Sequence, residues 1–322
     1  MAENTPLNRS ILRSRPVFAL SVFYSIPILL PPLFVWMTGI LAVPVAYICS
    51  RQGWSKEKGV TILAALLPAG ILAFFTGRLP IFVALLPLAA LGYSLFLSGQ
   101  RKQSPAQAAA CGLAVIAGCL TLCWLLYAQV TGTHPYQHLK AMIDAAIVSA
   151  GDMYRTSVDA PADMQAELDR VLESMRVVIP QILPAMLISI LLVTVWMNQV
   201  LWNALLLKTD PDQAPWPPYS TWKLPEHLIW LPICAAACYI FGPGPWKIIS
   251  LNALIISGVV YFFQGLAVFL HLLDRLKVPG YFRIILYGIL VIQSYGLILL
   301  SLLGIGDIWF NLRPEPESRE IP

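Results

Sequence analysis

The stretch from Asn252 to Arg313 constrains the fold of this chain more than any other. It consists of two long apolar runs joined by the short basic turn DRLKVPGYFR, which covers Asp274–Arg283. About 25 residues before the turn and about 23 after it carry no formal charge. A helix rises about 1.5 Å per residue, so each run can cross a hydrocarbon core about 30 Å thick. The stretch therefore predicts a transmembrane helical hairpin.

The composition of the whole chain supports a membrane protein. Hydrophobic residues make up 58% of the chain, charged residues only 12%, and the mean hydropathy is +0.71. A soluble domain carries about 25% charged residues. We expect an all-α polytopic transmembrane bundle whose main partner is the lipid bilayer. The net charge of +4 does not indicate nucleic-acid binding, because the basic residues lie in short turns between apolar runs.

Charge alternation predicts the topology. Basic residues occur in the N-terminal tail, at 51–58, at Arg101-Lys102 and in the turn before the last apolar run, whereas residues 134–175 carry seven acidic and three basic residues. The positive-inside rule then places the N-terminus in the cytoplasm and the acidic segment outside. We expect about nine spans, or eight if Pro16–Ser50, which Pro31-Pro32 interrupts, crosses once or re-enters.

Five regions follow from these patterns. They are a cytoplasmic tail at 1–15, N-terminal transmembrane helices at 16–132, an extracytoplasmic amphipathic segment at 133–176, C-terminal transmembrane helices at 177–306 and a tail at 307–322. The extracytoplasmic segment has two amphipathic patterns separated by Asp159-Ala-Pro161. They predict two interfacial helices, which form either a lid or a packed connector.

A polar stripe marks the first run of the hairpin. Ser257, Tyr261, Gln264 and His271 recur at spacings of 4, 3 and 7 residues, which places them on one face of a helix. An unsatisfied amide in hydrocarbon costs roughly several kcal/mol. We therefore expect the stripe to face protein. For His271, near the cytoplasmic end, a simple interfacial position is the alternative.

Two further patterns concern helix packing. Ala110, Ala114 and Gly118 follow one another at four-residue spacing, which is typical of a seam where another helix approaches closely. Gln199 and Asn203 share a face, with Asn198 beside it. Amides inside membranes usually join helices, so we favour a structural role for them over ligand binding.

Two motifs carry a family resemblance. The run YFFQGLAVFLHLLDRLKVPGYFR, followed by LGIGDIWFNLR, resembles the C-terminal signature of the YybS-like family, uncharacterised multi-pass membrane proteins of bacteria. This family is grouped by remote similarity with the substrate-binding S-components of energy-coupling-factor transporters. The resemblance implies the bacterial cytoplasmic membrane, and a small solute, a membrane coupling subunit and ATPases as partners. It implies no particular solute.

If that resemblance extends to function, a solute site should be open to the outside. The spans offer uncharged amides and aromatic rings for its lining, and the candidates are Asn252, Trp246, Tyr295 and Tyr136. Packing or membership of the interfacial aromatic belt is the alternative for each. The acidic segment and the loops near Pro31 and Gly242 would cover such a site.

Several classes of protein are disfavoured. The chain has no GxxxxGK[ST] motif for nucleotide phosphates and no HExxH motif, and the six cysteines lie in apolar runs without a CxxC pair. We expect no metal and no cofactor. Asp and Glu lie in connecting segments, at span ends or in the acidic segment, which disfavours ion-driven transporters and aspartyl intramembrane proteases.

Two functions remain. The first is a non-enzymatic, S-component-like subunit that binds a small solute and depends on partner proteins for energy. The alternative is a structural or scaffolding protein of the bacterial envelope that acts through helix contacts. An enzyme is disfavoured because no nucleophile, base and orienting residue come together in the sequence.

Overall fold

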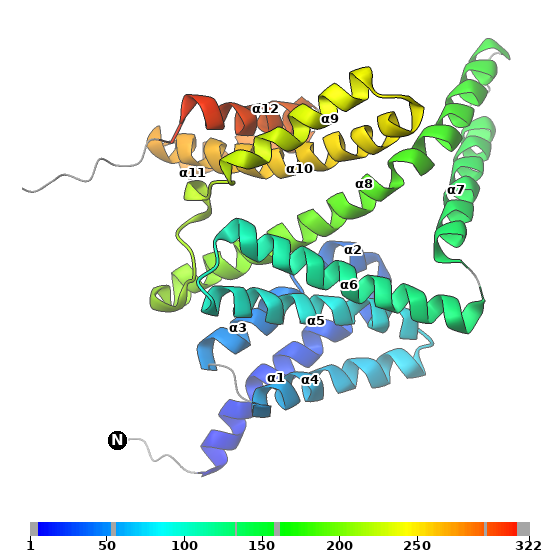
Figure 1. The fold of residues 1–322 in the computed structure, drawn as a ribbon. Helices are drawn as coiled ribbons and strands as arrows, with labels where there is room; N and C mark the ends of the chain where they lie inside the picture. Colours follow the sequence, from blue (N-terminus) through cyan, green and yellow to red (C-terminus); the bar gives the residue numbers. More distant parts are fainter. Residues whose placement is uncertain (1–5, 53–55, 133, 158–161, 293–294, 314–322) are drawn as a thin grey trace, which may run out of the picture. The chain divides into compact units, whose positions relative to one another are not determined.

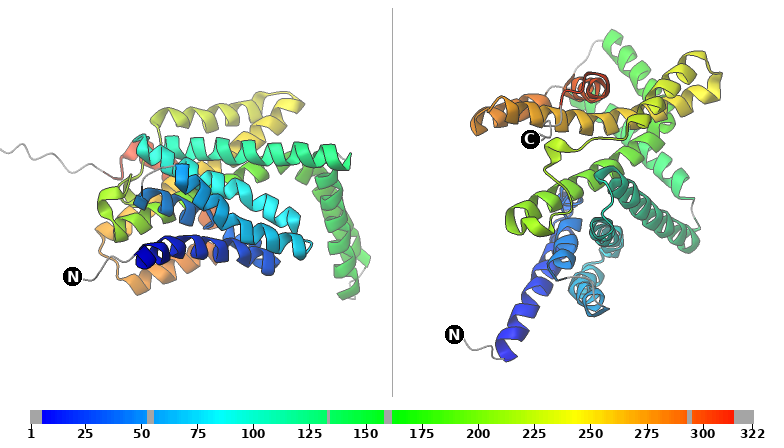
Figure 2. Two further views of the ribbon diagram at one scale, coloured as in Figure 1. Left: turned by 90° about the horizontal axis from the view of Figure 1, so that it is seen from below. Right: turned by 60° about the vertical axis from the view of Figure 1, so that its left-hand side comes forward.

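The computed structural model describes residues 6–52, 56–132, 134–157, 162–292 and 295–313, and within them the chain is helical with no strand (Figures 1 and 2). The α-helices are α1 (Pro6–Leu29), α2 (Phe34–Met37), α3 (Ala42–Gln52), α4 (Lys56–Phe75), α5 (Leu79–Gln100), α6 (Pro105–Thr131), α7 (Pro135–Ser157), α8 (Ala162–Thr209), α9 (Trp230–Phe241), α10 (Gly244–Arg275), α11 (Gly280–Ile292) and α12 (Tyr295–Phe310). The 3₁₀ turns are η1 (Pro31–Leu33), η2 (Pro211–Gln213), η3 (Tyr219–Thr221) and η4 (Glu226–Ile229). The predicted all-α class is confirmed.

Fewer helices than expected qualify as spans by length and composition. Among the described residues, four do so alone: Leu79–Gln100, Pro105–Thr131, Met164–Thr209 and Gly244–Arg275. Two bent pairs, each with an angle of 108°, raise the number to six: Phe18–Leu29 with Pro31–Met37, and Gly280–Leu290 with Tyr295–Phe310. The predicted count of eight or nine is not confirmed, because several apolar runs form short or broken helices.

The helical segments gather into two compact units. The first takes its residues from 1–120, 191–226 and 260–322, and the second from 121–190 and 227–259. Helices α6, α8 and α10 each contribute residues to both. The core of the first unit contains Leu20, Tyr24 and Ile28 at four-residue spacing on α1, which packs along α4. Helix α3 packs along α5 in the same unit.

The break at Pro31-Pro32 is stabilised by one arginine side chain from elsewhere in the first unit. Proline has no N–H and ends the α1 hydrogen-bond ladder. Arg78 donates to the carbonyls of Ile28 and Leu29, at 2.6 and 3.0 Å. The expected interruption of this apolar run is therefore a defined corner of the fold.

The small-residue seam predicted on α6 is not the face that this helix buries within the chain. The buried residues are Ala108, Gly112 and Ile116, and a Cβ atom at Gly112 would lie 2.9 Å from a Leu91 methyl group. The predicted residues Ala110, Ala114 and Gly118 are exposed. They are offset by two positions, or about 200° around the helix, from the buried set.

The regional boundaries differ from the expectation at two places. Helix α7 covers the first amphipathic pattern and the start of α8 covers the second, but α8 then continues without interruption across the expected boundary at 176/177 for a total of 48 residues. The expected C-terminal tail begins at 307, whereas α12 continues to Phe310. Residues 1–5, 158–161 and 314–322 of the expected tails and linker lie outside the described residues.

Candidate functional site

The chain between Asp210 and Pro225, here called the proline-rich segment, needs hydrogen-bond donors from outside itself. It contains five prolines, so it forms only short 3₁₀ turns and cannot satisfy its carbonyl groups in a helical ladder. Buried carbonyls without partners destabilise a fold. The first unit supplies such donors from Asn203 on α8 and from Arg313, which follows α12.

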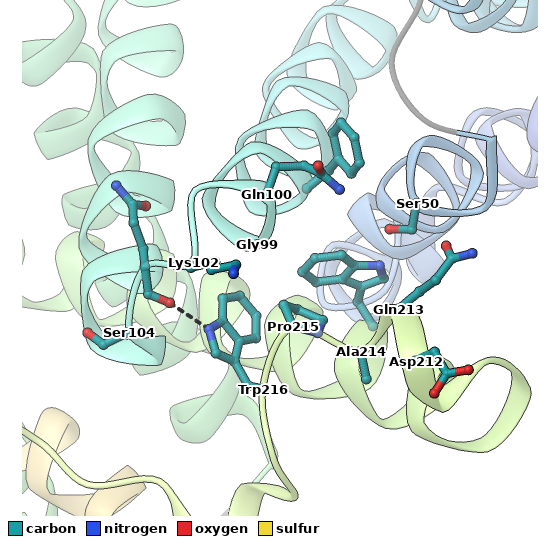
Figure 3. A pocket seen from close by; sticks show the side chains of 13 residues that line it. Ser50, Gly99, Gln100, Lys102, Ser104, Asp212, Gln213, Ala214, Pro215 and Trp216 are labelled. Atoms are coloured by element: carbon teal, nitrogen blue, oxygen red, sulfur yellow. Dashed lines mark hydrogen bonds between the residues drawn. The ribbon is translucent and has the colours of Figure 1, made fainter.

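The first half of the segment is held by α8 and by the turn after α5. Asn203 on α8 accepts a bond from the Trp216 backbone N–H at 3.2 Å and donates to the Pro217 carbonyl at 3.1 Å. The Trp216 indole N–H donates to the Gln103 carbonyl at 2.7 Å (Figure 3). Gln199 donates to the Pro105 carbonyl at 2.9 Å. These contacts give the predicted amides the structural role that we favoured for them.

The second half of the segment is held by a buried polar cluster of Gln264, Asp307 and Arg313. Arg313 donates to the carbonyls of Ser220 and Trp222 at 3.1 and 2.7 Å, and to Asp307 Oδ2 at 2.6 Å. Gln264 donates to the same Asp307 oxygen at 2.7 Å. Its own carbonyl oxygen accepts the Leu224 N–H at 3.0 Å. Each side chain is only about 3% exposed in the Arg313–Asp307 pair.

A close crossing of α10 and α12 lies beside this cluster. A Cβ atom added at Gly265 would lie 1.7 Å from the Leu300 carbonyl oxygen, and one at Gly304 would lie 2.1 Å from the Tyr261 carbonyl oxygen. No side chain fits at either position, so the two backbones touch. This contact places Asp307 within reach of Gln264.

The first half of the segment also lines a cavity of about 680 Å³ in the first unit. Figure 3 shows its lining, which comes from the end of α3, from α5 and the turn after it, from α8 and from the proline-rich segment. The lining residues are Ser50, Phe96, Gly99, Gln100, Lys102, Gln103, Ser104, Trp202, Asp212, Gln213, Ala214, Pro215 and Trp216. All of these belong to the first unit.

Two lining residues carry buried polar atoms without a hydrogen-bond partner. They are Trp202, through its indole Nε1, and Gln103, through Oε1. Trp202 is 1% exposed and its ring meets that of Trp216 edge to face at 5.6 Å. An unpaired buried polar group costs about 1–3 kcal/mol. Both atoms have almost no accessible surface, so neighbouring groups shield them from the cavity.

One lysine and one aspartate, Lys102 and Asp212, give the cavity lining two opposite charges. Lys102 follows the C-terminus of α5 with a φ of 52°, and the bond from Gln103 N–H to the Ser98 carbonyl closes the helix end. The positive φ of Lys102 is part of this helix cap, so it needs no functional explanation. The ammonium group nevertheless lines the cavity, and no ion pair in the described part of the chain involves Lys102 or Asp212.

The predicted ligand residues lie elsewhere, and none of them lines this cavity. Asn252, in the second unit, accepts the Ala185 N–H and donates to the Gln181 carbonyl, both at 2.8 Å. These two groups are four residues apart on α8, beside Pro184. The amide thus bridges a helical turn that the proline disturbs. The Asn252 amide oxygen and nitrogen are therefore already bonded to α8, although a ligand would need these same groups.

Aromatic rings make up the rest of the predicted ligand set. Tyr136 donates at 3.5 Å to the Pro180 carbonyl, which is the group that Pro184 leaves without its helical donor. Trp246 and Tyr295 are exposed, and they belong to different units. Their role in a solute site stays a prediction.

The polar stripe divides between the units. Ser257 is buried and donates to the Ala253 carbonyl at 2.6 Å. Tyr261 and Gln264 are buried in the first unit, whereas His271 is half-buried. Of the four, Gln264 joins the proline-rich segment to α12.

Sequence reasoning missed Asp307, Arg313 and the cavity lining. Asp307 stands at the end of an apolar run, where a carboxylate is ordinarily solvated, and Arg313 was expected in a tail. One signal was available. The motif LGIGDIWFNLR, the second of the two that carry the family resemblance, contains an acid and a base six residues apart, Asp307 and Arg313. No local pattern connects Ser50, Lys102 and Trp216.

These helices and motifs can be compared with known protein families. A family described as predicted membrane protein (DUF2232) matches residues 18–308. The chain belongs to the DUF2232 family. This match supports an integral membrane protein embedded in a lipid bilayer, and it extends over both units of this DUF2232 protein. No curated protein and no solved structure matches the chain. The described residues contain no group of three or more His, Cys, Asp or Glu that could hold a metal ion.

Proposed function

We propose that this chain is a non-enzymatic membrane protein that binds a small solute and depends on partner proteins for the energy of transport. The observation that carries the proposal is the cavity of about 680 Å³. Small-molecule sites commonly have volumes of about 300–1,000 Å³. The exposed lining residues Gln100, Lys102 and Gln213 offer hydrogen-bonding groups to a solute.

The dependence on partners rests on what the sequence lacks. The chain has no GxxxxGK[ST] motif, so its sequence gives no indication that it draws energy from ATP by itself. S-components solve the same problem with a membrane coupling subunit and ATPases. We propose partners of this kind.

The charge pattern supports a cavity that opens toward the cytoplasm of a bacterium. Arg51, Arg101, Lys102 and Lys208 lie at the helix ends that surround it. By the positive-inside rule this end faces the cytoplasm, as does the N-terminus. The proposed site is therefore at the opposite end from the one expected from sequence. In a cysteine-free background, Lys208→Cys should react only with reagent supplied from inside, and Gln137→Cys on α7 from outside.

The solute test uses the purified full chain. Native mass spectrometry in detergent, without added ligand, should detect a co-purifying small molecule. Ala214→Phe, which fills the half-buried lining, should abolish this adduct while thermal stability is retained. Ala110→Phe, at an exposed position of α6 outside the lining, is the matched control and should keep the adduct.

Two outcomes separate the proposed function from the scaffold alternative. Recovery of ATPases and a membrane coupling subunit with a loaded cavity supports transport. An empty cavity together with co-purifying envelope proteins favours a scaffold that acts through helix contacts. Loss of the adduct in both phenylalanine variants, or in neither, contradicts the assignment of the cavity.

A further inference from the structure

We infer that the α7–α8 hairpin of the second unit rests on the extracytoplasmic surface of the bilayer, with a methionine-rich face in contact with phospholipid. The hairpin, as named here, consists of α7 and residues 162–180 of α8. The inference concerns an interaction surface and depends on neither the cavity nor a solute. The sequence predicts two interfacial helices, but it does not show whether they pack together or which of their faces meet lipid.

The two helices lie side by side in antiparallel directions (Figure 1). A Cβ atom on Gly151 would lie 2.6 Å from a Leu172 methyl group, and four residues later on α7 Arg155 pairs with the earlier α8 residue Asp169. Ile147, one turn before Gly151, is buried. Ile147 and Gly151 on α7 and Leu172 on α8 therefore mark the line along which the helices touch.

Each helix carries an exposed apolar stripe beside this contact line. The members of the stripe recur at spacings of 4, 4 and 3 residues on α7 and of 7, 4 and 3 residues on α8. They are Met142, Ala146, Ala150 and Met153 on α7, and Met164, Val171, Met175 and Val178 on α8, all of them exposed. None of these side chains carries a formal charge.

Both stripes lie on the same side of the hairpin. Ala146 precedes Ile147 by one residue, and Val171 precedes Leu172 by one residue. One residue corresponds to a rotation of about 100° in an α-helix, so each stripe is displaced from the contact line in the same sense along its own helix. In an antiparallel pair this equal rotation brings the two stripes onto one face, here called the methionine face.

The opposite face of the hairpin is mainly charged. Asp152 follows Gly151 by one residue and Glu173 follows Leu172 by one residue, so both are rotated in the other sense. Arg155 pairs with Asp152 on this face. The hairpin thus has one apolar and one charged face, which is the pattern of helices that lie in the membrane interface.

The length of α8 inclines the hairpin toward the membrane. Residues 177–207 carry no formal charge and extend over about 46 Å at about 1.5 Å per residue, whereas the hydrocarbon core is about 30 Å thick. An apolar helix that is longer than the core tilts away from the bilayer normal. The hairpin continues α8 beyond this run, so it leans over the lipid surface.

Phospholipid matches the properties of the methionine face. Val178 belongs both to the α8 stripe and to the uncharged run, so the apolar surface continues from the membrane span onto the hairpin. Flexible methionine thioethers adapt to an irregular surface, as the boundary between headgroups and acyl chains is. Contact with lipid removes this surface from water and leaves the charged face solvated.

The test uses the full chain in phosphatidylcholine nanodiscs, in a cysteine-free background. Single cysteines carry the fluorophore bimane at Met153 or Val171 on the methionine face, and at Asp152 or Glu173 on the charged face. Phosphatidylcholine with a doxyl quencher near its headgroup should quench the first two labels at least about threefold more than the other two, because an interfacial helix buries its apolar face in the headgroup boundary. Iodide in the buffer should give the reverse order.

Every other pattern overturns the inference. Equal lipid quenching at all four positions shows that neither face prefers lipid. Labels on the methionine face that iodide reaches most readily show a face open to water, and labels that neither quencher reaches show a face covered by protein, including a second copy of this chain. Each face has two positions, so a variant that fails to fold leaves the comparison between faces intact.

A charge on the methionine face gives a second measurement. Ala146→Glu should reduce lipid quenching of the Val171→Cys label at least about threefold, because a carboxylate opposes burial in lipid. Ala141→Glu is the matched control: Ala141 is exposed three turns before Asp152, on the charged face, and its substitution should leave the quenching unchanged. Added salt should change the quenching by less than about twofold, since the contact is apolar. Equal losses in both glutamate variants, or a strong salt dependence, also overturn the inference.

Discussion

The two units each contain an arginine bonded to an aspartate, in opposite surroundings. In the first unit, Arg313 and Asp307 are each about 3% exposed, and Arg313 also binds two backbone carbonyls. In the second unit, Arg155 bonds Asp152 and Asp169 on the surface of α7 and α8, where the side chains are 42–62% exposed. Water competes for the exposed pair, whereas burial excludes water from the inner pair. The same chemistry should therefore have very different consequences for stability.

Two asparagines extend the comparison. Asn198 in the first unit accepts the Ala42 N–H and donates to the Thr38 carbonyl, both at 2.9 Å. Asn252 in the second unit makes the same pair of bonds to groups four residues apart on α8. Each amide bridges a disturbed helical turn, but Asn198 is fully buried and Asn252 is half-buried. The first unit again places the interaction in drier surroundings.

The largest effect is expected where backbones touch. Gly265→Ala on α10 should lower the free energy of unfolding by more than about 4 kcal/mol, because the methyl group overlaps the Leu300 carbonyl. Gly258→Ala, two turns earlier on the same helix, meets nothing within 4 Å and should change it by less than about 1 kcal/mol. Chemical unfolding in detergent measures both. Similar values for the two variants would disprove the close crossing.

The buried ion pair should come next. Arg313→Gln should destabilise by about 3–5 kcal/mol, since it leaves Asp307 buried without its cation. Arg155→Gln, the surface counterpart, should change the melting temperature far less. The double variant Asp307→Asn/Arg313→Gln should be more stable than Arg313→Gln alone, because no charge is left unpaired. Equal effects of the two arginine substitutions would remove the difference between the units.

A smaller effect is expected at the buried asparagine. Asn198→Leu should cost about 1–2 kcal/mol, because the Ala42 N–H loses its acceptor in an apolar environment. Asn252→Leu should cost less, since its surroundings are only half-buried. Thermal unfolding of both variants gives the order, and a reversed order would contradict the argument from burial.

The smallest effect depends on pH. Tyr219, in the proline-rich segment, donates to the Phe263 carbonyl at 2.5 Å, and burial raises the pKa of its phenol. The protonated form is favoured in the fold, so its stabilisation is complete below the unfolded pKa near 10 and is lost as the pH rises above it. Tyr219→Phe should lower stability at neutral pH by about 0.5–1.5 kcal/mol and reduce its fall above pH 10. Parallel pH profiles for both proteins would show that this phenol does not contribute.

The sequence by itself determined that the protein lies in a lipid bilayer and that its secondary structure is helical. Uncharged runs about 23–25 residues long require helices, because lipid cannot hydrogen-bond an open backbone. The prolines at 31 and 32 mark a real break, the amphipathic patterns mark α7 and the start of α8, and intramembrane amides join elements as expected. All of these follow from local spacing, which a helix converts directly into a face or an end.

Only the tertiary structure decided which faces and ends meet. Spacing predicted a seam on α6 but could not show that the chain buries the opposite face. It placed Asp307 at a span end but could not show that Gly265 and Gly304 bring α10 against α12, or that Arg313 returns to carbonyls more than 90 residues earlier. The cavity likewise joins Ser50, Lys102 and Trp216 from three separate segments. The physical reason is that helix rotation and chain path depend on packing between distant residues, which no local period contains.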